Sequence, residues 1–280
     1  MAATKTRRPT ITLPPIQDSI GARREYERAL RAMLRSLAAT VRSEVLPAAE
    51  AEIARQRAAM TQDAIGEYIF EGLKQLAVRL GVIAEGMVGR ILRLESERHT
   101  KKWLASVRST IGIDLAAVVS QEDLAEYLIT AAARNASLIK SLAGDTVKRV
   151  EQTIYSAVIN GETVAQVRMK LTKDFSISDR RAKVIARTEV AKLTSDLNRR
   201  RHEQAGITEY AFATSQDERV RKNHKAMEGL RCRYDDASVY LSDGKWVSRS
   251  NVGGVQLHPG QDVQCRCVSR AFVRIGDEEF

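Results

Sequence analysis

The chain of 280 residues is long enough for one large domain or two ordinary ones, each with a buried core. Aromatic residues make up only 5% of it, while Ala, Arg, Leu and Val are abundant, and this composition favours helices over an all-β fold. The formal net charge of +10 favours contact with polyanions, nucleic acid first among them, although a solvated Arg-rich surface has the same composition.

The sequence indicates neither a targeting signal nor a disulfide framework. No apolar run reaches the roughly 18 residues that span a bilayer, and residues 1–13 lack the apolar core of a signal peptide. The 3 cysteines are odd in number, which argues for free thiols in a reducing compartment. We therefore expect the protein to work in a cytoplasm, or in a particle assembled there.

The N-terminal half begins with residues 1–18, which contain three of the 5 prolines and no periodicity, and which therefore predict a flexible basic arm. Apolar residues then recur every three or four positions from Tyr26 to Val45. This spacing predicts an amphipathic helix that Pro47 ends or kinks. A second helical stretch runs from about Ile53 to Leu94, so that region 19–144 is predicted to be helical.

Glycines occur within the second stretch at positions 66, 72, 81, 86 and 89. Each glycine in a helix interior costs about 1 kcal/mol against Ala. Close helix packing, a kink, or a surface held against a partner would each explain them.

Local signals divide the next part of the chain into shorter helices. Ser120–Asp123 resembles the capped start of a helix that runs to about Leu142, and Gly144 is placed to end it. Further helices are predicted over residues 145–159 and 162–171. Ser178 is then expected to cap a basic helix that ends near Gly206.

The composition changes after residue 206, where half of the aromatic residues lie. Ser242–Lys245 between two apolar runs predicts a β-hairpin, and Asn, Gly and Pro between residues 251 and 260 predict an irregular loop. The predicted fold class is mostly α, with a long-helix N-terminal bundle followed by a small α+β C-terminal domain of short strands and long loops. We place this C-terminal domain at residues 145–280, with helices over 145–206 and the α+β unit over 207–275.

Three short motifs follow one another in an order that is more specific than any one of them. Arg187–Glu189 lies on the basic helix, Asp217–His224 follows the first expected strand, and Cys265–Cys267 closes the series. This succession resembles the C-terminal domain of the phage Mu F-like head morphogenesis family, over roughly residues 145–273. Phe212 stands where family members often carry Trp, and Gly260–Gln264 separate the proline from the Cys-x-Cys motif.

The resemblance implies a structural protein and not an enzyme. It implies a minor head protein of a tailed phage or prophage that binds the portal and takes part in head morphogenesis, DNA packaging or DNA delivery. The implied partners are the portal protein, capsid or scaffolding protein, and double-stranded DNA bound nonspecifically, with no membrane and no small-molecule substrate. The implied location is the interior of the head near the portal, and the host cytoplasm during assembly. Two alternatives stay open, a metal-dependent nuclease-like protein and a nonspecific DNA-binding protein.

Two imidazoles and two thiolates suit a tetrahedral zinc site: His224, His258, Cys265 and Cys267, with Cys232 as a substitute. Because alternate residues of a strand point to opposite faces, a bend is required to turn both sulfurs of the Cys-x-Cys motif inward. Buried thiols and hydrogen-bonded histidines explain the same residues without a metal. A structural zinc ion is therefore one of two open interpretations, and no catalytic residue is assigned.

The charged residues of the motifs are predicted to form structural ion pairs: Arg187, Glu189, Asp217, Arg219 and Arg221. We expect Glu189 to pair with Arg219 or Arg221, and Asp217 to cap a short helix. We expect Arg187 to reach acidic groups on the C-terminal unit.

The basic helix offers six side chains for nonspecific contact with DNA phosphates: Arg180, Arg181, Lys183, Arg199, Arg200 and Arg201. Consecutive helical residues are rotated by about 100°, so the Arg199–Arg201 triplet cannot share one face and also suits a solvated helix end. DNA binding by these residues is expected to be salt-sensitive.

Overall fold

The computed structural model describes residues 10–59, 66–119 and 122–274. The chain forms two compact units. The helical unit comprises Ile20–Leu92 and Leu128–Arg187, and the mixed unit comprises the described residues of Met1–Ser19, Arg93–Tyr127 and Thr188–Phe280. Each unit is therefore assembled from segments that are distant in sequence.

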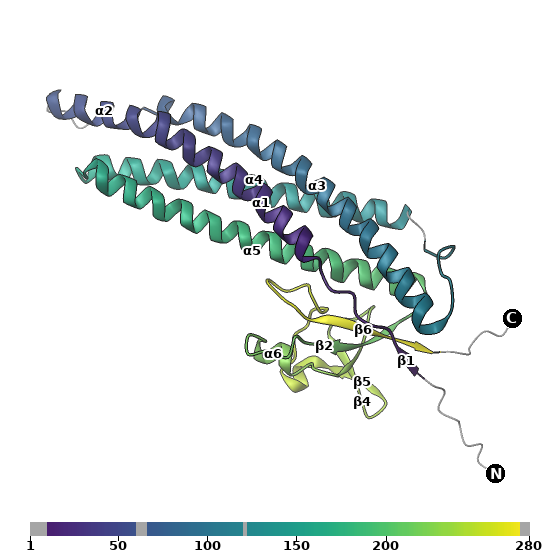
Figure 1. The fold of residues 1–280 in the computed structure, drawn as a ribbon. Coiled ribbons are helices and arrows are strands. Elements are labelled where there is room, and N and C mark those ends of the chain that lie inside the picture. Colours follow the sequence, from purple (N-terminus) through teal and green to yellow (C-terminus); the bar gives the residue numbers. More distant parts are fainter. Residues whose placement is uncertain (1–9, 60–65, 120–121, 275–280) are drawn as a thin grey trace, which may run out of the picture. The chain divides into compact units, whose positions relative to one another are not determined.

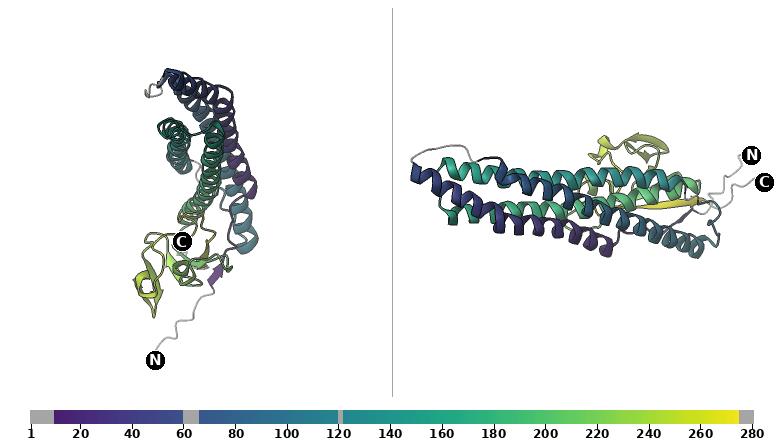
Figure 2. Two further views of the ribbon diagram at one scale, coloured as in Figure 1. Left: turned by 90° about the vertical axis from the view of Figure 1, so that its left-hand side faces the viewer. Right: turned by 90° about the horizontal axis from the view of Figure 1, so that it is seen from above.

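The helices are few and long. They are α1 (Ile20–Thr40), the π-helical segment η1 (Val41–Val45), α2 (Leu46–Ala59), α3 (Tyr68–Ile111), α4 (Glu122–Ile159) and α5 (Val164–Gln204). Within the helical unit, α1 and the corresponding parts of α3, α4 and α5 run side by side (Figures 1 and 2). The predicted periodicity of α1 is confirmed, because its buried residues recur every three or four positions from Ala22 to Leu37.

Polar bonds join the helices of the helical unit at several levels. Tyr26 of α1 donates to the side-chain oxygen of Asn135 in α4. Arg31 of α1 makes two parallel hydrogen bonds of 2.6 and 2.7 Å to Asp179 of α5, the bidentate geometry that fixes both partners best. Burial of apolar side chains stabilises the bundle, and these polar bonds fix the orientation of its helices relative to one another.

Two of the predicted helix boundaries are wrong, at Gly144 and at Ser178. At Pro47 the backbone stays helical, but the regular α-helix is interrupted just before it by the π-helical segment η1, in which the amide of Leu46 donates to the carbonyl of Val41. Gly144 lies inside α4, which continues to Ile159. Ser178 lies inside α5, buried, and its hydroxyl accepts a hydrogen bond of 2.9 Å from Thr146. Packing between long helices overrides these local signals, and the predicted cap at Ser120 and Gln121 lies outside the described residues.

The mixed unit contains the strands, as predicted for the C-terminal part of the chain. An antiparallel sheet has the order β1 (Thr10–Thr12), β6 (Val268–Arg274), β2 (Glu209–Ala213) and β3 (Arg231–Arg233). The predicted hairpin is present as β4 (Val239–Ser242) and β5 (Lys245–Ser248). Its turn residues Asp243 and Gly244 have φ of 49° and 77°, the left-handed values that an Asp-Gly hairpin turn requires.

The end of the predicted arm is ordered, contrary to the expectation for residues 1–18. Thr10–Thr12 pair with Phe272–Arg274 of β6, and the amide of Leu13 donates to the carbonyl of Ala271 at 2.9 Å. Leu13 and Ile16 are buried in the core of the mixed unit. The alternation of Thr, Ile and Thr suits an edge strand. Pro14 and Pro15, which have no amide hydrogen to donate, follow the last paired residue of the strand. Residues 1–9 lie outside the described residues.

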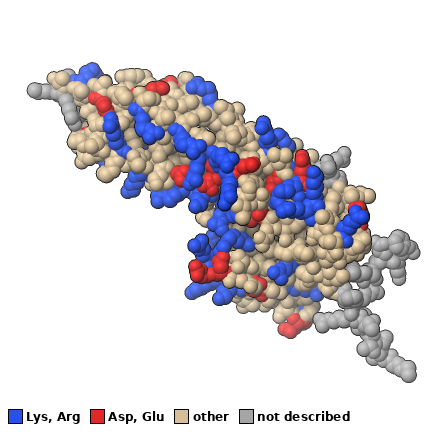
Figure 3. Space-filling view, viewed as in Figure 1, with Lys and Arg blue, Asp and Glu red and all other residues tan. Residues whose placement is uncertain are grey.

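Aromatic side chains fill the core of the mixed unit, with Trp103, Tyr210, Phe212 and Tyr234 all at least 98% buried. Short helical turns, α6 (Lys222–Lys225) and η2 (Arg249–Val252), flank the sheet. Among the described residues, no helix combines the length and apolarity needed to cross a membrane. Figure 3 shows Lys and Arg side chains spread among uncharged residues, with Asp and Glu side chains between them.

Candidate metal centre

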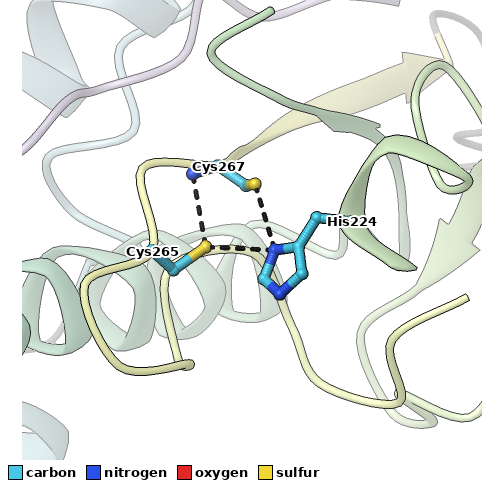
Figure 4. A group of neighbouring side chains, drawn as sticks. All are labelled: His224, Cys265 and Cys267. Atoms are coloured by element: carbon cyan, nitrogen blue, oxygen red, sulfur yellow. Dashed lines mark hydrogen bonds between the residues drawn. The ribbon is translucent and has the colours of Figure 1, made fainter. Parts of the chain in front are cut away.

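Three side chains of the mixed unit converge on one small volume: His224, Cys265 and Cys267 (Figure 4). The Nδ1 atom of His224 lies 3.4 Å from Sγ of Cys267 and 3.5 Å from Sγ of Cys265. All three ligand atoms lie within 4.8 Å of one another, and all three side chains are buried. The two thiols and the imidazole are ligands that soft divalent metals such as zinc prefer.

The bend that the Cys-x-Cys motif requires is present. The amide of Cys265 donates to the carbonyl of Asp262 at 3.1 Å, which closes a turn immediately before the motif. Gln264 has a φ of 55°, and its amide donates to the hydroxyl of Thr188 at 3.1 Å. Strand β6 begins only at Val268, so neither cysteine lies on a regular strand and both sulfurs point to the same side.

Asp262 holds the imidazole from its other side. Its Oδ2 atom lies 3.0 Å from Nε2 of His224 and 2.8 Å from Nη1 of Arg221, while Oδ1 accepts from the amide of Val263 at 2.7 Å. Burial opposes ionisation of this carboxyl, but the bonds from Val263 and His224 outweigh it and hold the pKa of Asp262 below its ordinary value. Asp262 is therefore a carboxylate that fixes the ring orientation of His224.

The electrostatics of the cluster favour one thiolate. A hydrogen bond from Cys267 lowers the pKa of Cys265 to about 4 against the cost of burial, and His224 contributes in the same direction. The same sulfur–sulfur pairing raises the pKa of Cys267. Hydrogen bonding to Cys265, opposed by burial, raises the pKa of His224. The site is therefore suited to positive charge placed between the sulfurs and the imidazole.

The other two predicted ligands lie elsewhere in the mixed unit. Nδ1 of His258 is 2.9 Å from the hydroxyl of Tyr210, and burial lowers the pKa of His258 to about 4. Cys232 is fully buried, and its thiol donates to the carbonyl of Leu230 at 3.5 Å. The expected four-residue set is thus reduced to three, because tertiary packing gives His258 and Cys232 other partners.

Several residues of the predicted ion pairs have partners other than those expected. Glu189 is buried and lies 3.5 Å from Lys192 on the same helix, while Arg221 binds Asp262 and the carbonyl of Val263 in place of Glu189. Asp217 accepts from the amide of Arg219 at 3.0 Å and forms an ion pair with Arg266, so it closes a turn ahead of α6 instead of capping a helix. Arg187 is half-buried on α5.

The candidate DNA-binding side chains differ in their accessibility. Arg201 is fully buried and donates to Gln204 at 2.7 Å and to Thr100 at 3.0 Å, so its prediction as a phosphate ligand is wrong. The other five are accessible in whole or part: Arg180 and Lys183 are exposed, Arg181 pairs with Asp145, Arg199 pairs with Glu203, and Arg200 lies over the ring of Tyr127.

Arg249 is a structural centre that the sequence pattern did not indicate. It is fully buried, and its guanidinium donates to four acceptors: the carbonyls of Val239, Val255 and Leu257, and the hydroxyl of Tyr210. The distances are 2.9–3.2 Å. An Arg among Ser and Asn after a hairpin is an ordinary surface pattern, so no local signal could have found it.

Comparison with known proteins supports the motif-based resemblance. The family model described as "Phage Mu protein F like protein" matches residues 148–270. An uncharacterized protein of Haemophilus influenzae is 28% identical over 187 residues, which are 66% of this chain and 38% of that protein. No solved structure matches this chain significantly. Residues 148–270, the segment that carries α5, the sheet strands β2 and β3 and the His–Cys cluster, are thus similar to the phage Mu protein F like family.

Proposed function

We propose that this protein is a minor head protein of a tailed phage or prophage, which binds the portal and takes part in head morphogenesis, DNA packaging or DNA delivery, and that it is not an enzyme. The observation that carries the proposal is the match of residues 148–270 to the phage Mu protein F like family. The net charge of +10 and the exposed Arg180 and Lys183 suit a protein that lies against packaged DNA, because cations bind backbone phosphates without reading sequence.

A groove in the helical unit supports a protein partner. It has a volume of about 620 Å³ and lies between α3 and α4. Val78 and Val82 of α3 border it with exposed fractions of 69% and 60%, which is unusual for apolar side chains grouped in one place. Apart from the buried Val147, the remaining lining residues are small or charged: Lys74, Ala77, Gly81, Lys140, Ala143, Gly144, Lys148 and Glu151.

The glycines of the groove are not required by packing within the chain. A Cβ atom added to Gly81 or Gly144 would meet no side chain or neighbouring helix within 4 Å. Each glycine nevertheless costs about 1 kcal/mol in a helix interior. Of the three explanations for the glycines of α3, these observations favour a surface held against a partner. Lys74 and Lys140 at the rim pair with Glu151 and Glu85 of the chain itself. The small residues on the floor and Lys148 at the rim suit one occupant, an apolar helix face of the portal protein with an acidic residue at its edge.

Gly81→Leu is expected to separate portal binding from stability. The leucine side chain fills the groove and lowers portal affinity at least tenfold, while helix propensity raises the stability of α3 by up to about 1 kcal/mol. The matched control is Gly86→Leu, on the same helix, where an added Cβ also meets nothing within 4 Å and which does not line the groove. Affinity is measured by titrating labelled protein with assembled portal rings. Equal portal binding by both variants would rule out the groove as the docking surface.

Co-expression with the portal protein of the same phage tests the function itself. Native mass spectrometry is expected to detect this chain bound to intact portal rings in fewer copies than the portal subunits. If the chain ignores the portal but binds DNA in low salt, the nonspecific DNA-binding alternative is correct. If it cuts DNA when supplied with a divalent metal, the nuclease-like alternative is correct.

A further inference from the structure

We infer that the Nδ1 atom of His224 and the sulfurs of Cys265 and Cys267 bind one Zn²⁺ ion, with water as the fourth ligand and Asp262 as the residue that positions the imidazole. This site is independent of the proposed function, since it concerns the internal construction of the mixed unit.

The spacing of the ligand atoms fits zinc. Zinc–nitrogen bonds of about 2.0–2.1 Å and zinc–sulfur bonds of about 2.3 Å at a tetrahedral angle place nitrogen and sulfur about 3.5–3.6 Å apart. The two nitrogen–sulfur distances in the cluster are 3.4 and 3.5 Å. A single ion therefore reaches all three atoms with little rearrangement of the side chains.

With a neutral imidazole, the ring can form a hydrogen bond to only one of the two sulfurs. When Nε2 of His224 donates its proton to Asp262, Nδ1 is left with one lone pair and can accept from one thiol. Two sulfurs nevertheless lie at nearly equal distances from this one nitrogen (Figure 4). A metal ion on the lone-pair axis of Nδ1 satisfies the nitrogen and both sulfurs together.

The surroundings of His224 are those of a metal-binding histidine. Metal-ligating histidines almost always donate their second ring proton to a carboxylate or carbonyl, which fixes the ring and raises its basicity. Asp262 supplies that carboxylate at 3.0 Å, and its own oxygens are held by Arg221 and by the amide of Val263. Because both carboxylate oxygens are engaged, the described residues offer three ligands, and water completes the tetrahedron.

A zinc ion at this place would tie α6 to the segment before β6, which lie about 40 residues apart in the sequence. Small units with short strands and long loops gain much of their stability from such a link. A nucleophilic role for Cys265, activated by His224 and by the hydrogen bond from Cys267, would require a substrate to reach its sulfur, and Cys265 is only 5% exposed.

The test is the zinc content of the purified full chain, measured by native mass spectrometry and by elemental analysis. One Zn²⁺ per chain is expected, a mass excess of about 65 Da that a strong chelator removes. Cys265→Ser and Cys267→Ser are expected to abolish zinc binding. The matched control is Cys232→Ser, which removes a buried thiol outside the cluster and is expected to keep the full zinc content. Asp262→Asn keeps all three ligands and is expected to weaken zinc affinity by about 10–100-fold in competition with a chromophoric chelator.

Cobalt substitution of the unaltered chain gives a second readout that does not depend on the folding of variants. Co²⁺ is expected to produce intense visible bands of a tetrahedral site and an ultraviolet thiolate-to-metal charge-transfer band that zinc abolishes. The inference is overturned if the unaltered chain takes up neither zinc nor cobalt at micromolar concentration, or if Cys232→Ser loses zinc as completely as Cys265→Ser. Rapid alkylation of Cys265 at unchanged rate with and without zinc would likewise assign it to a nucleophile.

Discussion

Replacing Arg249 with Ala is expected to lower the free energy of unfolding of the mixed unit by about 3–5 kcal/mol, the range for breaking a buried, charged hydrogen-bond centre. The side chain is fully buried and supplies the donors for three backbone carbonyls and the hydroxyl of Tyr210. The carbonyls of Val255 and Leu257 belong to an irregular loop and depend on this guanidinium. Alanine leaves these acceptors buried without a donor and opens a cavity.

Arg249→Lys is the matched control for charge. Lysine keeps the positive charge, but its single ammonium group cannot span acceptors that surround a planar guanidinium, so an intermediate loss of stability is expected. Urea denaturation followed by tryptophan fluorescence measures both variants, since Trp103 lies in the same core. A loss below about 1 kcal/mol for Arg249→Ala would contradict the assignment of Arg249 as a structural centre.

The mixed unit is expected to lose stability steeply as the pH falls below about 6.5. Burial lowers the pKa of His99 from 6.5 to about 4 and that of His202 from 6.5 to about 3. The folded state therefore keeps both rings neutral, while the unfolded state binds protons as soon as the pH falls below the ordinary value. Their contribution is fully present above pH 6.5 and is lost as the pH falls toward the folded-state pKa. At about 1.4 kcal/mol per pKa unit, His99 alone accounts for about 3 kcal/mol by pH 4.

The groups that face these histidines offset only part of the cost of their protonation: the hydrogen bond to Asn198 favours the protonated form of His99, but burial outweighs it. His99 is hydrogen-bonded to Asn198 at 2.9 Å, and the charges nearest to it are Arg98, Lys102 and Arg201, which oppose its protonation. His202 lies 2.7 Å from the hydroxyl of Tyr234 and packs against Trp103.

His99→Gln is the variant that isolates the histidine contribution from that of the acidic residues. Glutamine keeps a donor toward Asn198 and does not titrate, so the slope of unfolding free energy against pH between 6.5 and 4 is expected to flatten. Urea denaturation at a series of pH values in this interval gives both slopes. Identical slopes for the unaltered chain and His99→Gln would show that His99 is not the acid-sensitive group.

Periodicity and turn chemistry predicted some of the regular elements. The apolar spacing from Tyr26 to Val45 and the Asp243–Gly244 turn each specify one local conformation with no competitor. Gly144 and Ser178 misled the prediction, because a lone helix breaker or cap is overridden when the flanking residues pack against other helices. The thiol spacing of Cys265 and Cys267 identified two members of the cluster, and the Asp217–His224 motif identified the third.

The rest of the site depends on contacts between residues distant in sequence. His258 and Cys232 have the same chemistry as the clustered residues, and only their burial beside Tyr210 and Leu230 separates them from the cluster. Arg201 and Arg249 look like solvated cations in the sequence, yet both are fully buried by packing within the mixed unit. The charge and spacing of residues in the sequence do not distinguish an exposed Arg from a buried Arg that donates hydrogen bonds to backbone carbonyls.

The proposal that this protein is a portal-associated component of a phage head can be tested on purified particles. Heads assembled by the phage or prophage that encodes this chain would be purified, treated with protease from outside, and analysed by quantitative mass spectrometry. The chain is expected to be present, protected from the protease, and far less abundant than the major capsid protein. Its absence from purified heads, while it is abundant in the same lysate, would show that it is not a head component.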